Sequence, residues 1–170
     1  MKSVFILCLG NEIVADDGFG FAVSRELEGD PLLDNDDVEV EFAARAGYYL
    51  IDCLSGRRRA LIVDTIRTEH DEPGTLRFHE KDAFTSSRHL TSSHQISLPT
   101  ALRLAEELKV PMPERIDVLT VEALDLETLT EQLTPQVAAA VPRAVELIRK
   151  WITEEVCYAS HEERKTALEA

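Results

Sequence analysis

Runs of apolar residues with the length of a β-strand recur along the chain. Residues 3–9 and 60–64 are almost wholly apolar, which is typical of strands that are covered on both faces in a parallel sheet. Residues 38–43 and 75–79 alternate between apolar and polar side chains, as half-exposed or edge strands do. Residues 116–122 follow a proline-containing segment as a further strand, so the pattern predicts five strands.

Apolar residues at helical spacing lie between these strands. Phe19, Val23 and Leu27 recur every four residues and predict one helix. Similar patterns predict three more, over residues 47–54, 97–108 and 134–152. The alternation predicts an α/β fold: a three-layer sandwich whose mostly parallel, twisted five-stranded sheet carries helices on both faces. We expect a single α/β domain over residues 1–158 and a polar C-terminal tail over residues 159–170.

The turn that follows the first strand is acidic. Glu12, Asp16 and Asp17 lie between that strand and the helix that begins near Phe19. Ligands of open α/β sheets bind beyond the carboxyl ends of the strands, which is where this turn lies. The turn has no lysine and matches neither the dinucleotide fingerprint nor the phosphate-binding loop, so we interpret it as a site for a cation or a metal. The alternative is structural: Asp16 caps the helix, and Asp17 complements the helix dipole.

A second carboxylate, Asp64, ends the apolar run of residues 60–63. An acid at the carboxyl end of a central strand is expected to face the same crevice as Asp17. The alternative is that Asp64 is a cap or a turn residue, although no helix start follows within two residues.

A loop rich in serine and threonine, residues 85–95, holds two histidines. His94 comes just before a helix start at Ser97, with Pro99 in the first turn, and His89 lies five residues earlier. Both are candidate ligands or bases, because loops of this kind often carry chemistry. Their spacing is not diagnostic, and a lone histidine in a loop is usually only solvated.

Parallel strands would bring Asp17, Asp64 and His94 to one edge of the sheet. Two carboxylates and an imidazole suit a divalent ion such as nickel, zinc or manganese. Carboxylates that lie close together repel each other and raise one pKa, whereas a bound cation keeps both ionised. These three residues therefore form the candidate metal site.

Composition narrows the choice of partners. The 170 residues include 32 acidic and 18 basic side chains, and the formal charge of -14 opposes binding to nucleic acid or to an anionic membrane. No apolar stretch approaches the length that spans a bilayer, and no signal-peptide cleavage site follows the first apolar run, so we expect a soluble cytoplasmic protein. Cys8, Cys53 and Cys157 are too widely spaced for a disulfide framework, and we expect Cys8 in the core.

Three motifs, taken together and in this order, resemble those of the nickel-iron hydrogenase maturation endopeptidases. They are Gly10-Asn11 through Asp16-Asp17-Gly18-x-Gly20, the strand that ends in Asp64, and Ser93-His94-Gln95 before a helix start. The resemblance covers residues 3–155, which is nearly the whole chain.

This resemblance implies a metal-dependent endopeptidase of the cytoplasm. The family removes a short C-terminal extension from the precursor of a hydrogenase large subunit after nickel has been inserted. By the same resemblance, Asp17, Asp64 and His94 are metal ligands that recognise the nickel carried by the precursor. Asp16 is then the neighbouring cap.

One turn departs from the family pattern. Members commonly carry an Asp-Gly-Gly-Thr-like turn, associated with substrate selection, where this chain has Phe42-Ala43-Ala44-Arg45-Ala46-Gly47. The departure implies a substrate from a different hydrogenase subgroup, or a non-cleaving assembly factor that binds the nickel-loaded precursor. The Gly-x-Ser-x-Gly and His-Glu-x-x-His motifs of other peptidases are absent from the sequence. A nucleotide-binding oxidoreductase ranks last, because the first turn is acidic.

Overall fold

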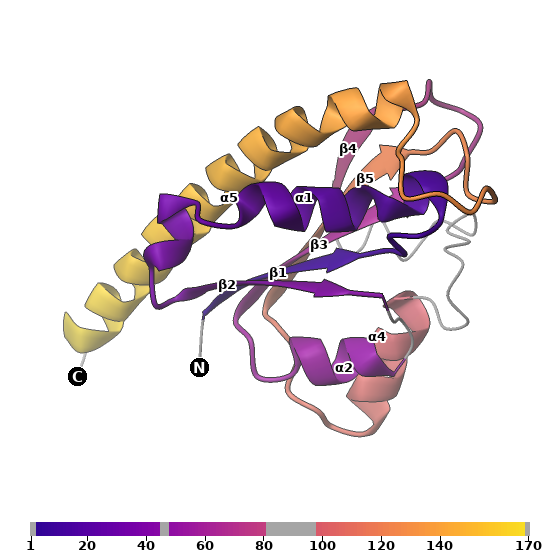
Figure 1. Ribbon diagram of the computed structural model, residues 1–170. Helices are drawn as coiled ribbons and strands as arrows, with labels where there is room; N and C mark the ends of the chain where they lie inside the picture. Colours follow the sequence, from indigo (N-terminus) through magenta and orange to yellow (C-terminus); the bar gives the residue numbers. More distant parts are fainter. Residues whose placement is uncertain (1–2, 45–47, 81–97, 169–170) are drawn as a thin grey trace.

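Five strands form a single sheet in the order β2-β1-β3-β5-β4 (Figure 1). The computed structural model describes residues 3–44, 48–80 and 98–168. The strands are β1 Val4–Leu9, β2 Val38–Ala43, β3 Arg59–Ile66, β4 Leu76–Glu80 and β5 Arg115–Glu122. All neighbouring strands pair in parallel except β4, which is an edge strand antiparallel to β5. The predicted five-stranded, mostly parallel sheet is confirmed.

Helices cover both faces of the sheet (Figure 1). Helices α1 and α5 lie on one face, and α2 and α4 lie on the other. Their bounds are α1 Phe19–Leu27, α2 Tyr49–Leu54, α4 Leu98–Glu107 and α5 Pro135–Leu168, with short 3₁₀ helices η1 Ala15–Gly18 and η2 Pro31–Asp34. The chain therefore folds as the three-layer α/β sandwich that its pattern predicts.

The side chains of β1 divide the core into two layers. Val4, Ile6 and Cys8 pack with α1 and α5, whereas Phe5 and Leu7 pack with α2 and α4. This two-sided burial is the physical reason for the continuous apolar run in the sequence. Cys8 is fully buried, and burial raises the pKa of its thiol to about 12, which confirms the predicted core position.

The central strands do not end level with one another. The pairing of β1 with β3 stops at Cys8 and Val63, but β3 continues along β5 as far as Ile66. Asp64 therefore lies inside β3, two residues before its end, whereas the sequence pattern placed it at the end of the strand. From Asp64 onward, β3 no longer pairs with β1, and the Asp64 side chain is only half-buried.

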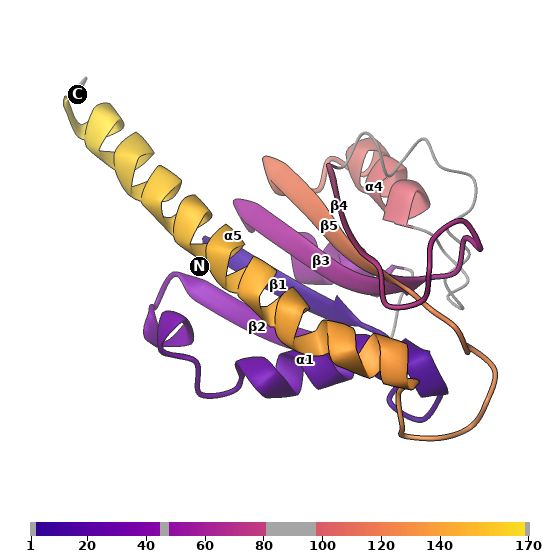
Figure 2. The ribbon, with the colours of Figure 1, turned by 90° about the horizontal axis from the view of Figure 1, so that it is seen from above.

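Helix α5 is 34 residues long and continues without interruption through Pro142. Figure 2 shows its C-terminal part extending past the strands of the sheet. Its backbone stays helical to Leu168, so most of the segment predicted as a polar tail continues the helix, and the domain boundary at residue 158 stays a prediction. Within the described ranges, no helix is both long and apolar enough to cross a bilayer.

Buried polar contacts tie α5 to the amino ends of the strands. Trp151 Nε1 donates to Asp117 Oδ2 at 2.7 Å. Arg115 Nε lies 2.8 Å from Asp117 Oδ2, and its Nη1 lies 3.0 Å from Glu155 Oε1. Arg59 Nε lies 3.6 Å from Glu155 Oε2. Both carboxylates are buried, and each has a cationic partner.

Candidate active site

Two glycines allow η1 and α1 to approach the end of β1. Gly10 has a φ of 146°, and a Cβ atom there would lie 2.0 Å from the carbonyl oxygen of Asp17. A Cβ atom at Gly20 would lie 2.0 Å from the carbonyl oxygen of Leu9. The backbone N–H of Asn11 donates to the carbonyl oxygen of Asp17 at 3.0 Å. This approach, which leaves no room for a side chain, places Asp17 at the carboxyl end of β1.

Asp17 and Asp64 lie close enough for their charges to interact. Asp17 is buried and Asp64 is half-buried. Burial raises the pKa of the Asp64 carboxyl to about 7, and the negative charge of Asp17 adds to the rise. The backbone N–H of Thr65, which donates to Asp64 Oδ1 at 2.8 Å, opposes it. The structure thus brings together two of the three residues that the sequence assigned to this edge.

A divalent cation beside these two carboxylates would cancel their repulsion and keep both ionised. The oxygen ligands are therefore suited to a cation. In the part of the chain that the structure describes, no three His, Cys, Asp or Glu side chains are grouped to hold a metal ion. His94, the third predicted ligand, and His89 lie outside the described residues.

Asp16 does not cap the helix that follows it, so the capping interpretation is wrong for this residue. Neither η1 nor α1 has a side-chain cap. Asp16 is fully buried, and its carboxylate accepts hydrogen bonds from residues more than 100 positions away. The donors are the N–H groups of Leu124 and Asp125, both at 2.9 Å, and the N–H and hydroxyl of Thr134, at 2.7 and 3.0 Å.

Backbone hydrogen bonds join the same two segments. The N–H of Ala15 donates to the carbonyl oxygen of Thr130 at 2.9 Å, and the N–H of Thr130 donates to that of Ile13 at 3.0 Å. The N–H of Asp16 donates to the carbonyl oxygen of Asp125 at 3.0 Å. The turn that carries Asp17 is therefore fixed to the loop between β5 and α5.

The sequence of this chain is similar to those of known proteins. A sequence model of the hydrogenase maturation proteases matches residues 22–151. The chain belongs to the hydrogenase maturation protease family. The protease is similar to the hydrogenase expression/formation protein HupD from Rhizobium leguminosarum bv. viciae, with 31% identity over 156 residues, which are 87% of this chain and 75% of HupD.

Solved structures share the fold of the protease. The hydrogenase maturating endopeptidase HybD from E. coli matches it with a TM-score of 0.76 at 24% identity, over 91% of this chain and 94% of HybD. The NiFe hydrogenase maturation protease HybD from Thermococcus kodakarensis matches with a TM-score of 0.66 at 26% identity, over 89% of this chain and 99% of that protein. The family expected from the three motifs is confirmed, and the chain is a peptidase.

Sequence reasoning missed the contacts of three residues at the carboxyl end of the sheet. Thr65 Oγ1 donates to the carbonyl oxygen of Asp16 at 3.2 Å. Glu122 is buried and accepts bonds from the N–H and the hydroxyl of Thr68 at 2.7 and 2.8 Å, so it holds the loop that follows β3. Thr134 was expected only to begin the last helix, but its hydroxyl donates to Asp16. All three lie near a strand end or before a helix start, which is the sequence signal that they share.

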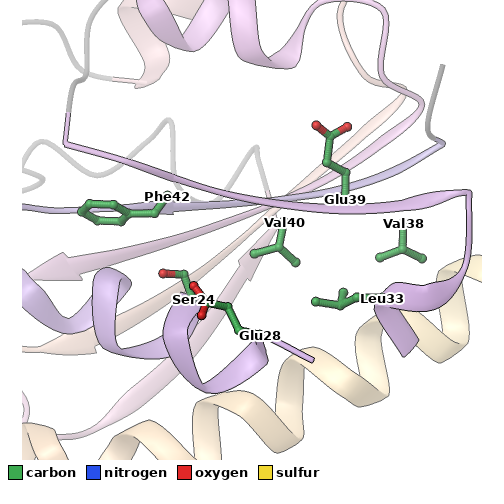
Figure 3. A pocket seen from close by; sticks show the side chains of 7 residues that line it. All are labelled: Ser24, Glu28, Leu33, Val38, Glu39, Val40 and Phe42. Atoms are coloured by element: carbon green, nitrogen blue, oxygen red, sulfur yellow. The ribbon is translucent and has the colours of Figure 1, made fainter. Parts of the chain in front are cut away.

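A cavity of about 310 Å³ lies beside the edge strand β2 of the protease. It is lined by Ser24, Glu28, Leu33, Val38, Glu39, Val40 and Phe42, and includes neither site carboxylate. Figure 3 shows Val38 and Val40 pointing from β2 toward α1 and η2, with Glu39 on the opposite face of the strand. Phe42 packs edge-to-face on Phe21, with ring centroids 5.1 Å apart. The first residue of the turn that departs from the family pattern is therefore engaged in packing.

Proposed function

We propose that this protease removes a C-terminal extension from the precursor of a nickel-iron hydrogenase large subunit after nickel has been inserted. Family membership supports the reaction class. The observation that carries the proposal is the pair of carboxylates, Asp17 and Asp64, whose charges interact at the carboxyl end of the parallel sheet. The precursor is the partner, and the reaction takes place in the cytoplasm.

Nickel belongs to the substrate in this proposal, and Asp17, Asp64 and His94 are the protease groups that contact it. Carboxylate and imidazole ligands suit nickel. A divalent ion next to the scissile bond can polarise a carbonyl oxygen or lower the pKa of a bound water. The protease supplies the negative charge that attracts the ion and the fixed geometry that aligns the peptide with it.

The position of α4 supports a role for His94. The carbonyl oxygen of Pro111 accepts the N–H of Gly56, and the carbonyl oxygen of Arg58 accepts the N–H of Glu114, so the chain that follows α4 lies at the amino ends of the strands. Figure 1 shows that α4 begins on the side where β1 ends. His94 precedes the first residue of α4 by four positions, a reach of up to about 14 Å in an extended chain.

A cleavage assay tests the proposal. The nickel-loaded precursor is incubated with the protease, and the loss of mass is followed by mass spectrometry. We expect Asp17→Asn, Asp64→Asn and His94→Ala each to slow cleavage by more than about 100-fold, beyond the 10- to 100-fold typical of residues that only orient metal ligands. Asp30→Asn is the matched control, because Asp30 is also buried and hydrogen-bonded but belongs to the η2 N-cap.

Two outcomes would contradict this assignment. Cleavage at the wild-type rate by the Asp17 or Asp64 variant would remove the carboxylates from the mechanism. Tight binding of the precursor by the wild-type protein without any loss of mass would support the non-cleaving assembly factor instead.

A further inference from the structure

We infer that Asp16 is a positioning residue, whose buried carboxylate holds the neighbouring Asp17 in place against Asp64. The inference rests on the proposed function, because it assigns Asp16 a task within that same site. Asp16 itself faces the interior, since none of its surface is exposed. It acts on the reaction only through the residue that follows it.

The carboxylate of Asp16 is held from two directions. Its Oδ2 accepts bonds from Leu124 N–H, Asp125 N–H and the hydroxyl of Thr134, and its Oδ1 accepts the N–H of Thr134. The charge also lies beside the start of α5, since Thr134 precedes the first residue of that helix, and a helix N-terminus stabilises a nearby anion. Because η1 is only four residues long, fixing Asp16 also fixes the backbone of Asp17.

A second link reaches the other carboxylate of the site. The carbonyl oxygen of Asp16 accepts the hydroxyl of Thr65 at 3.2 Å. Thr65 is the residue after Asp64, and its backbone N–H donates to the Asp64 carboxylate at 2.8 Å. Asp16 therefore precedes one site carboxylate in the chain and is bonded to the neighbour of the other. The distance between Asp17 and Asp64 depends on this connection.

An asparagine at position 16 cannot reproduce the arrangement. Both oxygens of the Asp16 carboxylate accept bonds from N–H donors. In either orientation, the NH₂ group of an asparagine would face at least one of these donors, and the buried N–H would lose its partner. The backbone hydrogen bonds between η1 and the loop between β5 and α5 would remain, but the side-chain anchor that fixes the position of Asp17 would be weakened.

The experiment compares Asp16→Asn and Thr134→Val with two controls. Thr134→Ser keeps the hydroxyl that Thr134→Val removes. Asp30→Asn removes another buried carboxylate, which accepts Leu32 N–H at 3.0 Å and Arg149 Nε at 2.5 Å, far from the site in the fold. All variants are assayed at a temperature at which circular dichroism shows them to be fully folded. The readouts are kcat and KM on the nickel-loaded precursor, and the affinity of the protease alone for Ni²⁺ by calorimetry.

We expect Asp16→Asn to lower kcat and the Ni²⁺ affinity about 10- to 100-fold, with little change in KM, as is typical of residues that orient ligands. Thr134→Val should show a smaller loss in both readouts, and Thr134→Ser should restore them. Asp30→Asn should leave kcat and the Ni²⁺ affinity unchanged. If Asp16→Asn does not fold, the two Thr134 variants decide the question alone.

The inference is overturned if folded Asp16→Asn keeps the wild-type kcat and Ni²⁺ affinity, or if Asp30→Asn loses as much as Asp16→Asn does. The inference is also overturned if Thr134→Val and Thr134→Ser have the same kcat and the same Ni²⁺ affinity. The proposed function fails separately, when Asp17→Asn cleaves the precursor normally. Loss of cleavage in Asp17→Asn with normal cleavage in Asp16→Asn removes only the positioning role.

Discussion

Acidic side chains at the two ends of the parallel sheet have opposite kinds of charged neighbours. At the amino ends of the strands, Asp117 and Glu155 are buried beside Arg115, and Trp151 adds a hydrogen bond. At the carboxyl ends, Asp64 lies beside another carboxylate, and the structure shows no ion pair with Lys or Arg for it among the described residues.

This difference separates a stabilising end of the sheet from the end that we propose to be functional. A buried acid with a cationic partner and satisfied hydrogen bonds keeps its charge at little net cost and fixes one arrangement of the chain. An acid next to another acid costs stability when ionised, and a cation that binds there removes that cost. The amino end thus holds α5 on the sheet, whereas the carboxyl end is suited to bind a cation.

Gly20→Ala should displace the backbone that carries Asp17 at the carboxyl end of the sheet. Its Cβ atom would lie 2.0 Å from the carbonyl oxygen of Leu9, so α1 would have to move away from β1 and carry Asp17 with it. We expect cleavage of the nickel-loaded precursor to fall by about 100-fold, the effect of a displacement near 1 Å at a reacting site. Gly29→Ala is the control for backbone strain away from the site: a Cβ atom there meets nothing within 4 Å, but the φ of 77° strains an alanine, so this variant should lose some stability while the folded protein keeps its cleavage rate. A Gly20→Ala variant with wild-type activity would show that this close approach is unnecessary.

Asp117→Ala should lower the stability of the protein without changing the cleavage rate of the folded form. It leaves the buried N–H of Trp151 without its partner and removes the ion pair with Arg115. We expect the free energy of unfolding, measured in urea, to fall by about 2–3 kcal/mol, while kcat of the folded protein stays the same. Glu114→Ala removes an exposed partner of Arg59 and should cost less than about 1 kcal/mol. A large loss of kcat in Asp117→Ala would mean that the two ends are coupled.

Asp64→Asn should abolish cleavage yet stabilise the metal-free protein. The pKa of Asp64 in the folded protein is about 7, above the usual value, so its contribution to stability is complete below about pH 4 and is lost as the pH rises through 7. We expect Asp64→Asn to raise the free energy of unfolding at pH 7.5 by about 1–2 kcal/mol, a value reduced because water screens this half-buried group. At pH 4 the gain should vanish.

Asp30→Asn is the contrasting control for that experiment. The N–H of Leu32 lowers the pKa of Asp30, as does Arg149, so the ionised side chain stabilises the fold above about pH 4 and this contribution is lost as the pH falls. Asp30→Asn should therefore destabilise the protein at pH 7.5. If wild type and Asp64→Asn have the same free energy of unfolding at both pH values, the ionised Asp64 carboxylate does not destabilise the fold.

Much of the fold follows from local pattern. The apolar runs of β1 and β3 mark strands covered on both faces, and strand–helix alternation then leads to a parallel sheet with acids at its carboxyl edge. The same reasoning brought Asp17 and Asp64 together. It could not place Asp64 inside β3, because the end of a strand depends on how far its neighbour β5 continues.

Long-range polar contacts lie beyond local pattern. Asp16 and Asp17 are adjacent and identical in type, and nothing near them shows which one turns inward. The answer depends on Leu124 and Thr134, which are more than 100 residues away in the chain. The length of α5 was underestimated for another reason: residues 159–168 lack an apolar stripe but are rich in good helix formers such as Glu, Lys, Arg and Ala.

The burial of Cys8 also provides a way to observe the sheet opening. Alkylating reagents react with a thiolate, and this thiol is both neutral and inaccessible while β1 stays between β2 and β3. Cys157 is exposed and should react first, which makes it an internal reference on the same molecule. The rate at which Cys8 is labelled thus reports how often β1 separates from its neighbours, and faster labelling in a variant would show that the core around β1 has been weakened.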